Sequence, residues 1–345
     1  MTEVRQYVVG SRFARTGLVC VAEVAEQIGR LTAPYLSITP GAAERGEWQV
    51  VADGQPTSAA VPESVTAQGE VSVDYAVDHD AKMLFHLAPR GPAWVTQSVL
   101  RATRAIHRSA ASRQGAVFLH AGVVDLGGIG VALVGGSRAG KTSFIMATAL
   151  SGAGVMVCND DVSLLAEHDE VVGIGWPRSI SVRLDTFDLL FGAGAATRIR
   201  ASLSHPANQT LLSLKESGAE PHGTALLYPE EYADLLGTTI GRSARVDAVV
   251  HLSLADDPSE VDLSPVAPPA NEELLAARML AEANKHLNIF GHEPAAGAPD
   301  RTRAALAALP AFRLRYDFRD VRRHVDGLAD YLSARLRPAA SLSTG

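Results

Sequence analysis

The sequence predicts an α/β protein with a mixed sheet, preceded by a small β-rich region. An apolar strand at residues 131–134 runs into a glycine-rich turn, and an apolar helix at 143–150 follows. Short strand-like segments then succeed one another without helices between them, which favours a mixed sheet over strict strand–helix alternation. Residues 1–90 contain the alternating patterns of half-buried strands.

The length and composition are those of a chain that can bury a hydrophobic core. It has 345 residues, enough for about two domains. Hydrophobic residues make up 47% and charged residues 20%. The net charge of −7, without a basic block, argues against nucleic acid as a partner. No run of about 18 apolar residues and no signal-type N-terminus occurs, so we expect a cytoplasmic protein with no membrane partner. Cys20 and Cys158 lie too far apart in sequence to suggest a disulfide framework.

Four parts are expected along the chain: a β-rich accessory domain at 1–90, a linking helix at 91–115, a core domain at 116–336 and a flexible tail at 337–345. The accessory domain should contain a helix at 21–31, a loop at 53–69, and strands at 5–9, 35–38, 47–51, 71–77 and 82–87, the last two forming a hairpin. In that hairpin, His86 is expected to face solvent.

The linking helix should carry an apolar face and a second face with Arg101, Arg104 and Arg108. We expect the arginine face to be solvated, with contact to an acidic substrate segment as the alternative. Beyond the glycine turn, we expect strands at 155–158, 162–165, 170–175, 180–183, 225–229, 246–254 and 312–318, a loop at 193–223, and helices at 271–287 and 321–336.

The glycine turn has a chemical signature of its own. Gly135-Gly136-Ser137-Arg138-Ala139-Gly140-Lys141-Thr142 fits the Walker A pattern G-x-x-x-x-G-K-[ST] between a strand and a helix. Loop N–H groups and the helix N-terminus would point at phosphate oxygens, Lys141 would reach the β- and γ-phosphates, and Thr142 would ligate Mg²⁺. The expected nucleotide-binding residues are therefore Gly135, Gly136, Ser137, Arg138, Ala139, Gly140, Lys141, Thr142 and Ser143. The alternative is a turn that only caps a helix.

Two further segments flank this loop. His120-Ala121-Gly122-Val123-Val124-Asp125 precedes it on a strand, and Asp160-Asp161 ends a strand that follows it. A carboxylate pair beside a phosphate loop can hold Mg²⁺ and take a proton from an attacking hydroxyl, although in isolation it could equally be a polar turn. The combination resembles the catalytic domain of the HPr kinase/phosphorylase family, whose strand H-x-x-x-V-D precedes the loop and whose D-D pair follows it.

The resemblance implies a phosphoenolpyruvate-carboxykinase-like P-loop core that uses ATP or GTP with Mg²⁺. It implies that Asp161 is the general base, that Asp160 binds metal or water, and that His120 is a catalytic residue near the transferred phosphate, with Lys141 as a third. We therefore expect the His120 imidazole within about 8 Å of the Asp161 carboxylate. The alternative is a core histidine bonded to a backbone carbonyl.

The segment 174–178 lacks the glutamate of the family's E-x-R-G-x-G motif. The smaller relatives, which modify a hydroxyl on a ribosomally made peptide, therefore match better than the enzyme that acts on HPr. Arg138 and Arg178 are candidates to pair with phosphate or a substrate carboxylate, or else form structural salt bridges.

The expected partners are a nucleotide and a hydroxyl-bearing peptide or small molecule, with a homo-oligomer left open. A leader peptide could add a strand to the accessory domain, which could equally be a plain accessory module. The rival interpretations are a nucleotide-dependent switch or assembly factor without phosphotransfer, and a metabolite or amino-acid kinase.

Overall fold

The computed structural model describes residues 3–52, 54–65, 73–87, 92–208, 223–281, 284 and 298–336. Packing divides the chain into two compact units. Unit 1 comprises Met1–Phe118, Trp176–Leu235 and Leu280–Arg301, and unit 2 comprises Leu119–Gly175, Leu236–Met279 and Thr302–Gly345. The domain limits expected from the sequence stay a prediction.

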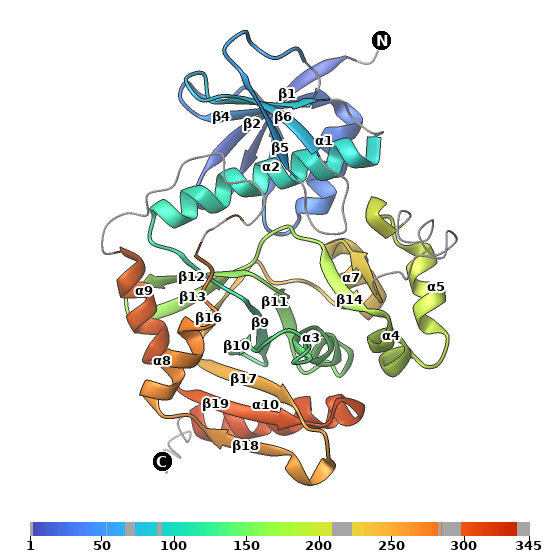
Figure 1. Cartoon of the computed structure of the whole chain (residues 1–345), viewed down its shortest axis with the longest axis vertical. Coiled ribbons are helices and arrows are strands. Elements are labelled where there is room, and N and C mark those ends of the chain that lie inside the picture. The colour runs from blue at the N-terminus through green and yellow to red at the C-terminus, as the bar shows by residue number, and fades with distance from the viewer. Residues whose placement is uncertain are drawn as a thin grey trace, which may run out of the picture. The chain divides into compact units, whose positions relative to one another are not determined.

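Unit 1 is built on a mixed sheet that is drawn in blue at the top of Figure 1. The sheet has seven strands in the order β3-β1-β2-β4-β7-β6-β5. Its strands are β1 (Val4–Gly10), β2 (Arg15–Val21), β3 (Ser37–Pro40), β4 (Trp48–Val51), β5 (Val61–Val65), β6 (Val73–Asp78) and β7 (Met83–Leu87). Helices α1 (Ala22–Thr32) and α2 (Pro92–Arg113) pack on this sheet. The unit also contains β14 (Ile180–Arg183), α4 (Leu184–Phe191), α5 (Ala195–Ser202), β15 (Thr224–Leu227) and α7 (Pro229–Leu236).

Helix α2 confirms that the 91–115 segment is helical, while its linking role stays a prediction. The expectation of a solvated arginine face is wrong. Arg101 and Arg108 are each only 5% exposed. The guanidinium of Arg104 donates to the Pro177 carbonyl at 3.0 Å, and that of Arg108 lies 4.4 Å from the centre of the Phe118 ring. Burial, together with the neighbouring Arg178 charge, holds the pKa of Arg104 well below its usual value. Local periodicity alone suggests that the arginine face of α2 is exposed to solvent. In the structure, segments from elsewhere in the sequence cover it.

Four other expectations for this unit need correction. His86 does not face solvent: it is 7% exposed, and its ring meets that of Tyr75 edge-on at 6.0 Å. The expected loop at 53–69 contains strand β5, which pairs with β6, while residue 53 and residues 66–69 lie outside the described residues. The expected loop at 193–223 contains helix α5, while its part at 209–222 lies outside the described residues. The predicted 35–38 strand is displaced to β3.

Unit 2 contains a six-stranded mixed sheet with the order β11-β9-β10-β17-β19-β18. These strands are β9 (Ala121–Leu126), β10 (Ile129–Val134), β11 (Val155–Cys158), β17 (Ala248–Leu254), β18 (Asp262–Pro265) and β19 (Ala311–Tyr316). A second sheet has the order β16-β13-β12-β8. Its strands are β8 (Val117–Leu119, which begins in unit 1), β12 (Val162–Glu167), β13 (Glu170–Ile174) and β16 (Ser243–Val246). The prediction of an α/β protein with mixed sheets is confirmed.

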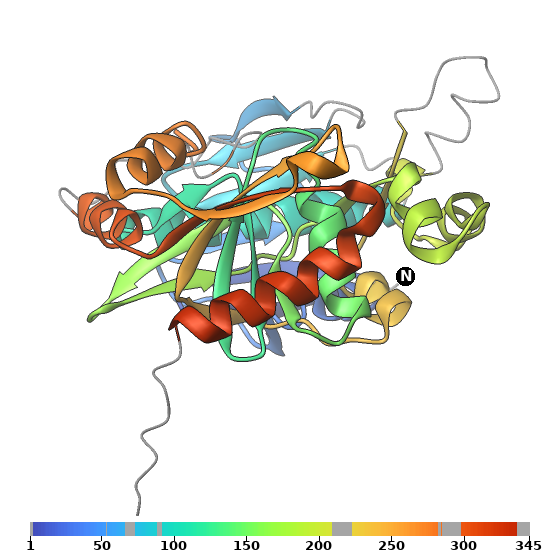
Figure 2. The ribbon, with the colours of Figure 1, turned by 90° about the horizontal axis from the view of Figure 1, so that it is seen from below.

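The helices of unit 2 are α3 (Lys141–Leu150), α8 (Pro268–Ala276), α9 (Ala298–Ala307, which begins in unit 1) and α10 (Val321–Leu336), with short 3-10 turns η1 (Pro258–Glu260) and η2 (Phe318–Asp320). Helix α3 packs against β9 and β11, and α10 packs alongside α3 (Figure 2). All six residues of β10 are buried, as its continuous apolar run predicts.

The helix expected at 271–287 is wrong at residues 277–281, because α8 ends at Ala276. Residues 282, 283 and 285–287 of that expected helix lie outside the described part of the chain. The chain then turns, and Met279 forms an antiparallel bridge with Leu119. A strand-like pairing of this kind requires extended backbone, which is incompatible with continuing the helix. No helix within the part of the chain that the structure describes is long and apolar enough to cross a membrane.

His107, on α2, generates a prediction about pH. The side chain is fully buried, with Nδ1 2.7 Å from the Ser11 hydroxyl and Nε2 3.2 Å from the Thr16 hydroxyl. Burial lowers the pKa of His107 to about 4. Between that value and the unfolded value of about 6.5, the unfolded chain binds more protons than the folded one, so stability falls as pH falls.

We expect the free energy of unfolding to drop by about 2 kcal/mol from this residue alone between about pH 7 and pH 5. In His107→Gln, which keeps a polar side chain but cannot titrate, that part of the drop should vanish in denaturant unfolding curves. Exposed His79 provides the control, because His79→Gln should leave the pH dependence intact. A drop of equal size in His107→Gln and the wild type would contradict the assignment.

Candidate functional site

The β9–β10 hairpin determines where His120 lies. The two strands pair antiparallel, and the pairing ends with Val134 opposite Ala121. His120, directly before β9, and Gly135, directly after β10, therefore lie at neighbouring positions just beyond the paired segment. Because the loop begins at Gly135, the hairpin places the histidine of the preceding strand at the start of that loop.

Strand β11 brings the acidic pair to the same edge. It runs antiparallel to β9, with Val155 opposite Asp125 and Cys158 opposite Val123. The residues after Cys158 consequently continue toward the start of β9. Gly122 makes this approach close: a Cβ there would lie 2.9 Å from the carbonyl oxygens of both Cys158 and Asn159.

His120 and the acidic pair form a compact cluster. His120 Nδ1 lies 2.8 Å from Asp160 Oδ1 and 3.2 Å from Asp161 Oδ1. The expected proximity of His120 and Asp161 is therefore present. The Asp161 side chain is 3% exposed, against 30% for His120 and 26% for Asp160. Asp161 also has a φ of 51°, in the left-handed region, where a non-glycine residue stores strain.

Lys141 joins this cluster from the other side. Its Nζ donates to the Gly135 carbonyl at 2.8 Å and to the Gly136 carbonyl at 3.3 Å, and it lies 3.3 Å from His120 Nε2. An ammonium can only donate, so Nε2 accepts from Lys141 while Nδ1–H of a neutral imidazole donates to Asp161. The sequence Lys141–His120–Asp161 is thus a continuous hydrogen-bonded line across the mouth of the loop.

The conformation of the loop depends on Gly140 and on its contact with Tyr316. Gly140 has a φ of 79° and precedes the first residue of α3, Lys141. A Cβ at Gly140 would lie 2.0 Å from the hydroxyl oxygen of Tyr316, which donates to the Gly140 carbonyl at 3.0 Å. No side chain caps this helix N-terminus, so its N–H groups are directed at the loop interior, where an anion is favoured.

The other residues of the motif lie along the same turn. Gly135 and Ser143 are buried, Gly136, Ala139 and Thr142 are half-buried, and Ser137 and Arg138 are exposed. Arg138 has a φ of 66°. All the residues that the sequence predicts for the site therefore lie in unit 2, at one edge of its sheet. Arg178 belongs to unit 1, and its proposed role stays a prediction.

Oxygen ligands for a cation gather between the loop and β11. Asn159 Nδ2 donates to the Thr142 hydroxyl at 3.3 Å. Asn159 Oδ1 is buried and accepts no hydrogen bond from any residue that the structure describes. Ligand atoms of His120, Asp160 and Asp161 lie within 4.8 Å of one another. Carboxylate, hydroxyl and amide oxygens, reached directly or through water, are the donors that Mg²⁺ prefers, so the residues present fit this ion.

Three contributors were missed at the sequence level. Asn159 directly precedes the acidic pair, and this position in the sequence is the signal that could have identified it as a site residue. Tyr316 lies within the strand predicted at 312–318 and ends β19, and no motif connects it with Gly140. Arg278 fell inside a helix that was expected to continue to residue 287, and it in fact lies beside the loop. Its side chain approaches Gly136, at 3.3 Å from the position of a Cβ on that residue.

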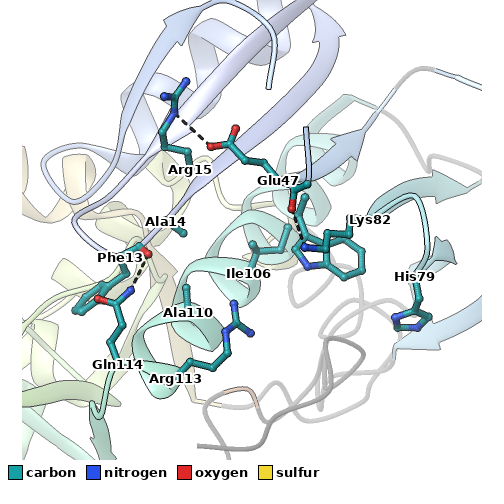
Figure 3. A pocket seen from close by; sticks show the side chains of 12 residues that line it. Phe13, Ala14, Arg15, Glu47, His79, Lys82, Ile106, Ala110, Arg113 and Gln114 are labelled. Carbon is teal, nitrogen blue, oxygen red and sulfur yellow. Dashed lines mark hydrogen bonds and ion pairs between the residues drawn. The ribbon is translucent and has the colours of Figure 1, made fainter. Parts of the chain in front are cut away.

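Unit 1 contains a separate cavity of about 640 Å³ (Figure 3). It lies between α2 and the strand ends of the sheet, and its floor includes the buried Phe13, Ile106 and Ala110. Arg15 and Glu47 form an ion pair at its rim at 3.6 Å, and Lys82 donates to the Gly46 carbonyl. None of the residues predicted for the site lines this cavity.

No family model matches the sequence, and no curated protein matches it. The solved structures that match include that of the Hpr(Ser) kinase/phosphatase from Coxiella burnetii. That match has a TM-score of 0.31 and 11% sequence identity, and it covers 63% of this chain and 96% of that chain. A likeness at this level leaves the function to be inferred from the geometry of the site.

Proposed function

We propose that this protein is a kinase that transfers the γ-phosphoryl group of ATP or GTP to a hydroxyl group of a peptide or small molecule. One observation carries the proposal: His120, Lys141 and Asp161 lie in a hydrogen-bonded line at the mouth of a strand–loop–helix turn. Phosphoryl transfer requires positioning and charge neutralisation more than covalent chemistry. A buried carboxylate, an imidazole and a loop-bound ammonium supply both.

The turn would hold the nucleotide by its phosphates. The N–H groups of the loop and the uncapped N-terminus of α3 offer donors and a partial positive charge to the phosphate oxygens. Lys141 Nζ already points along the loop, at the Gly135 and Gly136 carbonyls. It would exchange these neutral partners for the β- and γ-phosphates, which make stronger, charge-assisted hydrogen bonds.

Thr142 and Asp160 would hold Mg²⁺, with Asn159 Oδ1 accepting from a metal-bound water. When bound, the ion would neutralise phosphate charge and orient the γ-phosphate. Asn159 fixes the Thr142 hydroxyl through its amide N–H, which orients the hydroxyl oxygen before any ligand arrives.

Asp161 would receive the proton of the acceptor hydroxyl. The hydroxyl oxygen forms a bond to the γ-phosphorus, the bond from that phosphorus to the oxygen of the nucleoside diphosphate breaks, and the proton passes to Asp161. His120 Nδ1–H donates to the Asp161 carboxylate and fixes its orientation. The left-handed backbone of Asp161 holds the carboxylate at the loop mouth at a cost of about 1–3 kcal/mol, as strained residues at functional sites do.

The acceptor class we propose is a peptide hydroxyl, with a metabolite alcohol as the second candidate. A peptide could add to unit 1 as a strand, because β3 and β5 are the outer strands of the seven-stranded sheet. Val61, on the outer strand β5, is 56% exposed. A nucleotide-dependent switch without phosphotransfer is the rival account, and it would not require Asp161 as a base.

The first prediction of the proposed function concerns nucleotide binding. MgATP or MgGTP should raise the melting temperature, since only the folded chain has the loop; at 100 times Kd the gain is about 2.7 kcal/mol. Lys141→Ala should abolish the shift because the ammonium contacts the phosphates. Lys82→Ala, which removes an exposed lysine of unit 1, should keep it. An equal rise in melting temperature in Lys141→Ala and in the wild type would show that the loop does not bind the nucleotide.

The second prediction separates the kinase from the switch. Asp161→Asn keeps the size of the side chain but removes the base, so MgATP affinity should stay within a few-fold. Hydrolysis of radiolabelled ATP, with water in place of the acceptor hydroxyl, should slow by about 10²–10⁴-fold. Asp169→Asn, at an exposed turn of the same unit, should hydrolyse at the wild-type rate. Undiminished hydrolysis by Asp161→Asn would favour the switch.

A further inference from the structure

Arg278 is held beside the proposed catalytic line by the backbone. Its carbonyl accepts a hydrogen bond from the His120 N–H at 2.9 Å. The adjacent residues Leu119 and Met279 form an antiparallel bridge. Arg278 therefore follows α8 in a segment that is tied to the residue before β9, and all of these residues lie in unit 2.

The side chain of Arg278 reaches the loop. A Cβ built on Gly136 would lie 3.3 Å from Arg278 Nη2 and 3.8 Å from Arg278 Cζ. The Gly136 carbonyl also accepts from Lys141 Nζ at 3.3 Å. A guanidinium and an ammonium thus both approach Gly136, and Lys141 in turn lies 3.3 Å from His120 Nε2.

The charges around Arg278 leave it available for an anion. It is half-buried, and within the described residues its side chain forms no hydrogen bond and no ion pair. The two carboxylates of the cluster, Asp160 and Asp161, both face His120. Placing two cations beside one another in a partly buried site is unfavourable unless negative charge lies between them. The planar fork of arginine matches two oxygens of a phosphoryl group.

We propose that Arg278 binds the oxygens of the transferred phosphoryl group and stabilises its charge in the transition state. This inference rests on the proposed kinase function. As the bond from the γ-phosphorus to the leaving diphosphate oxygen breaks and the bond to the acceptor oxygen forms, the acceptor proton moves to Asp161. Negative charge meanwhile develops on the leaving oxygen and is spread over the equatorial oxygens. Arg278 keeps its own protons throughout and acts by charge and hydrogen bonds.

The test uses MgADP with aluminium fluoride, a planar mimic of the phosphoryl group in transfer, and measures binding by calorimetry. In the wild type, fluoride and aluminium should tighten MgADP binding. In Arg278→Ala and Arg278→Gln, the Kd of MgADP alone should stay within about threefold of the wild-type value. The factor by which aluminium fluoride lowers that Kd should be smaller than in the wild type by about tenfold or more. Arg278→Lys should restore part of the tightening, because lysine brings back the charge but not the fork.

Arg245→Ala is the matched control. Arg245 lies at the opposite end of β10, where its carbonyl faces Gly130, and it forms exposed ion pairs with Glu170 and Asp247. In this variant, aluminium fluoride should lower the Kd of MgADP by the same factor as in the wild type. Full tightening in both Arg278→Ala and Arg278→Gln would overturn the role of Arg278 and leave the kinase proposal standing. A wild-type protein that binds no MgADP, or that shows no tightening, would overturn both proposals.

Discussion

The site depends on the pairing of β9 with β10 on one side and β11 on the other. Both pairings are antiparallel, so the start of β9, the end of β10 and the end of β11 meet at one edge of the sheet. These three strand ends carry His120, the loop and the acidic pair. A displacement of one residue in either register would turn every side chain of the strand to the opposite face, and the hydrogen bonds around His120 would be lost.

The electrostatics of the site follow from this geometry. Asp161 is almost fully buried, and a buried carboxylate is unfavourable unless it is paired or hydrogen-bonded. His120 provides that hydrogen bond, and Lys141 provides positive charge one residue further along the line. In the proposed function, a nucleotide would add negative charge at the end where Lys141 and Arg278 lie. The arrangement therefore separates a cationic end that suits phosphate from a carboxylate end that suits a hydroxyl proton.

The sequence predicts the local parts of this structure well. The apolar run before Gly135 and the glycine–lysine–threonine sequence predict β10, the turn and α3, because strand, turn and helix propensities are all encoded within about 20 residues. The proximity of His120 and Asp161 was expected from a resemblance in motifs. It could not be derived from periodicity, because it depends on the order of strands in the sheet.

Features that depend on distant segments were missed. Arg278 continues the periodicity of α8, and only the bridge between Met279 and Leu119 shows that the helix has already ended. Arg101 and Arg108 lie on a face that reads as solvated, but residues from other segments of unit 1, such as Trp176 and Phe118, cover the Arg108 guanidinium. Neither the bridge nor the cover has a signature in the local sequence.

The central claim is that the loop holds a nucleoside triphosphate with its γ-phosphate facing His120 and Asp161. A crystal structure of the protein with Mg²⁺ and a non-hydrolysable ATP analogue tests it most directly. The account predicts γ-phosphate oxygens within about 3 Å of Lys141 Nζ and of the Arg278 guanidinium, with the metal bound by Thr142 and Asp160. An analogue bound elsewhere, or a γ-phosphate directed away from Asp161, would contradict it.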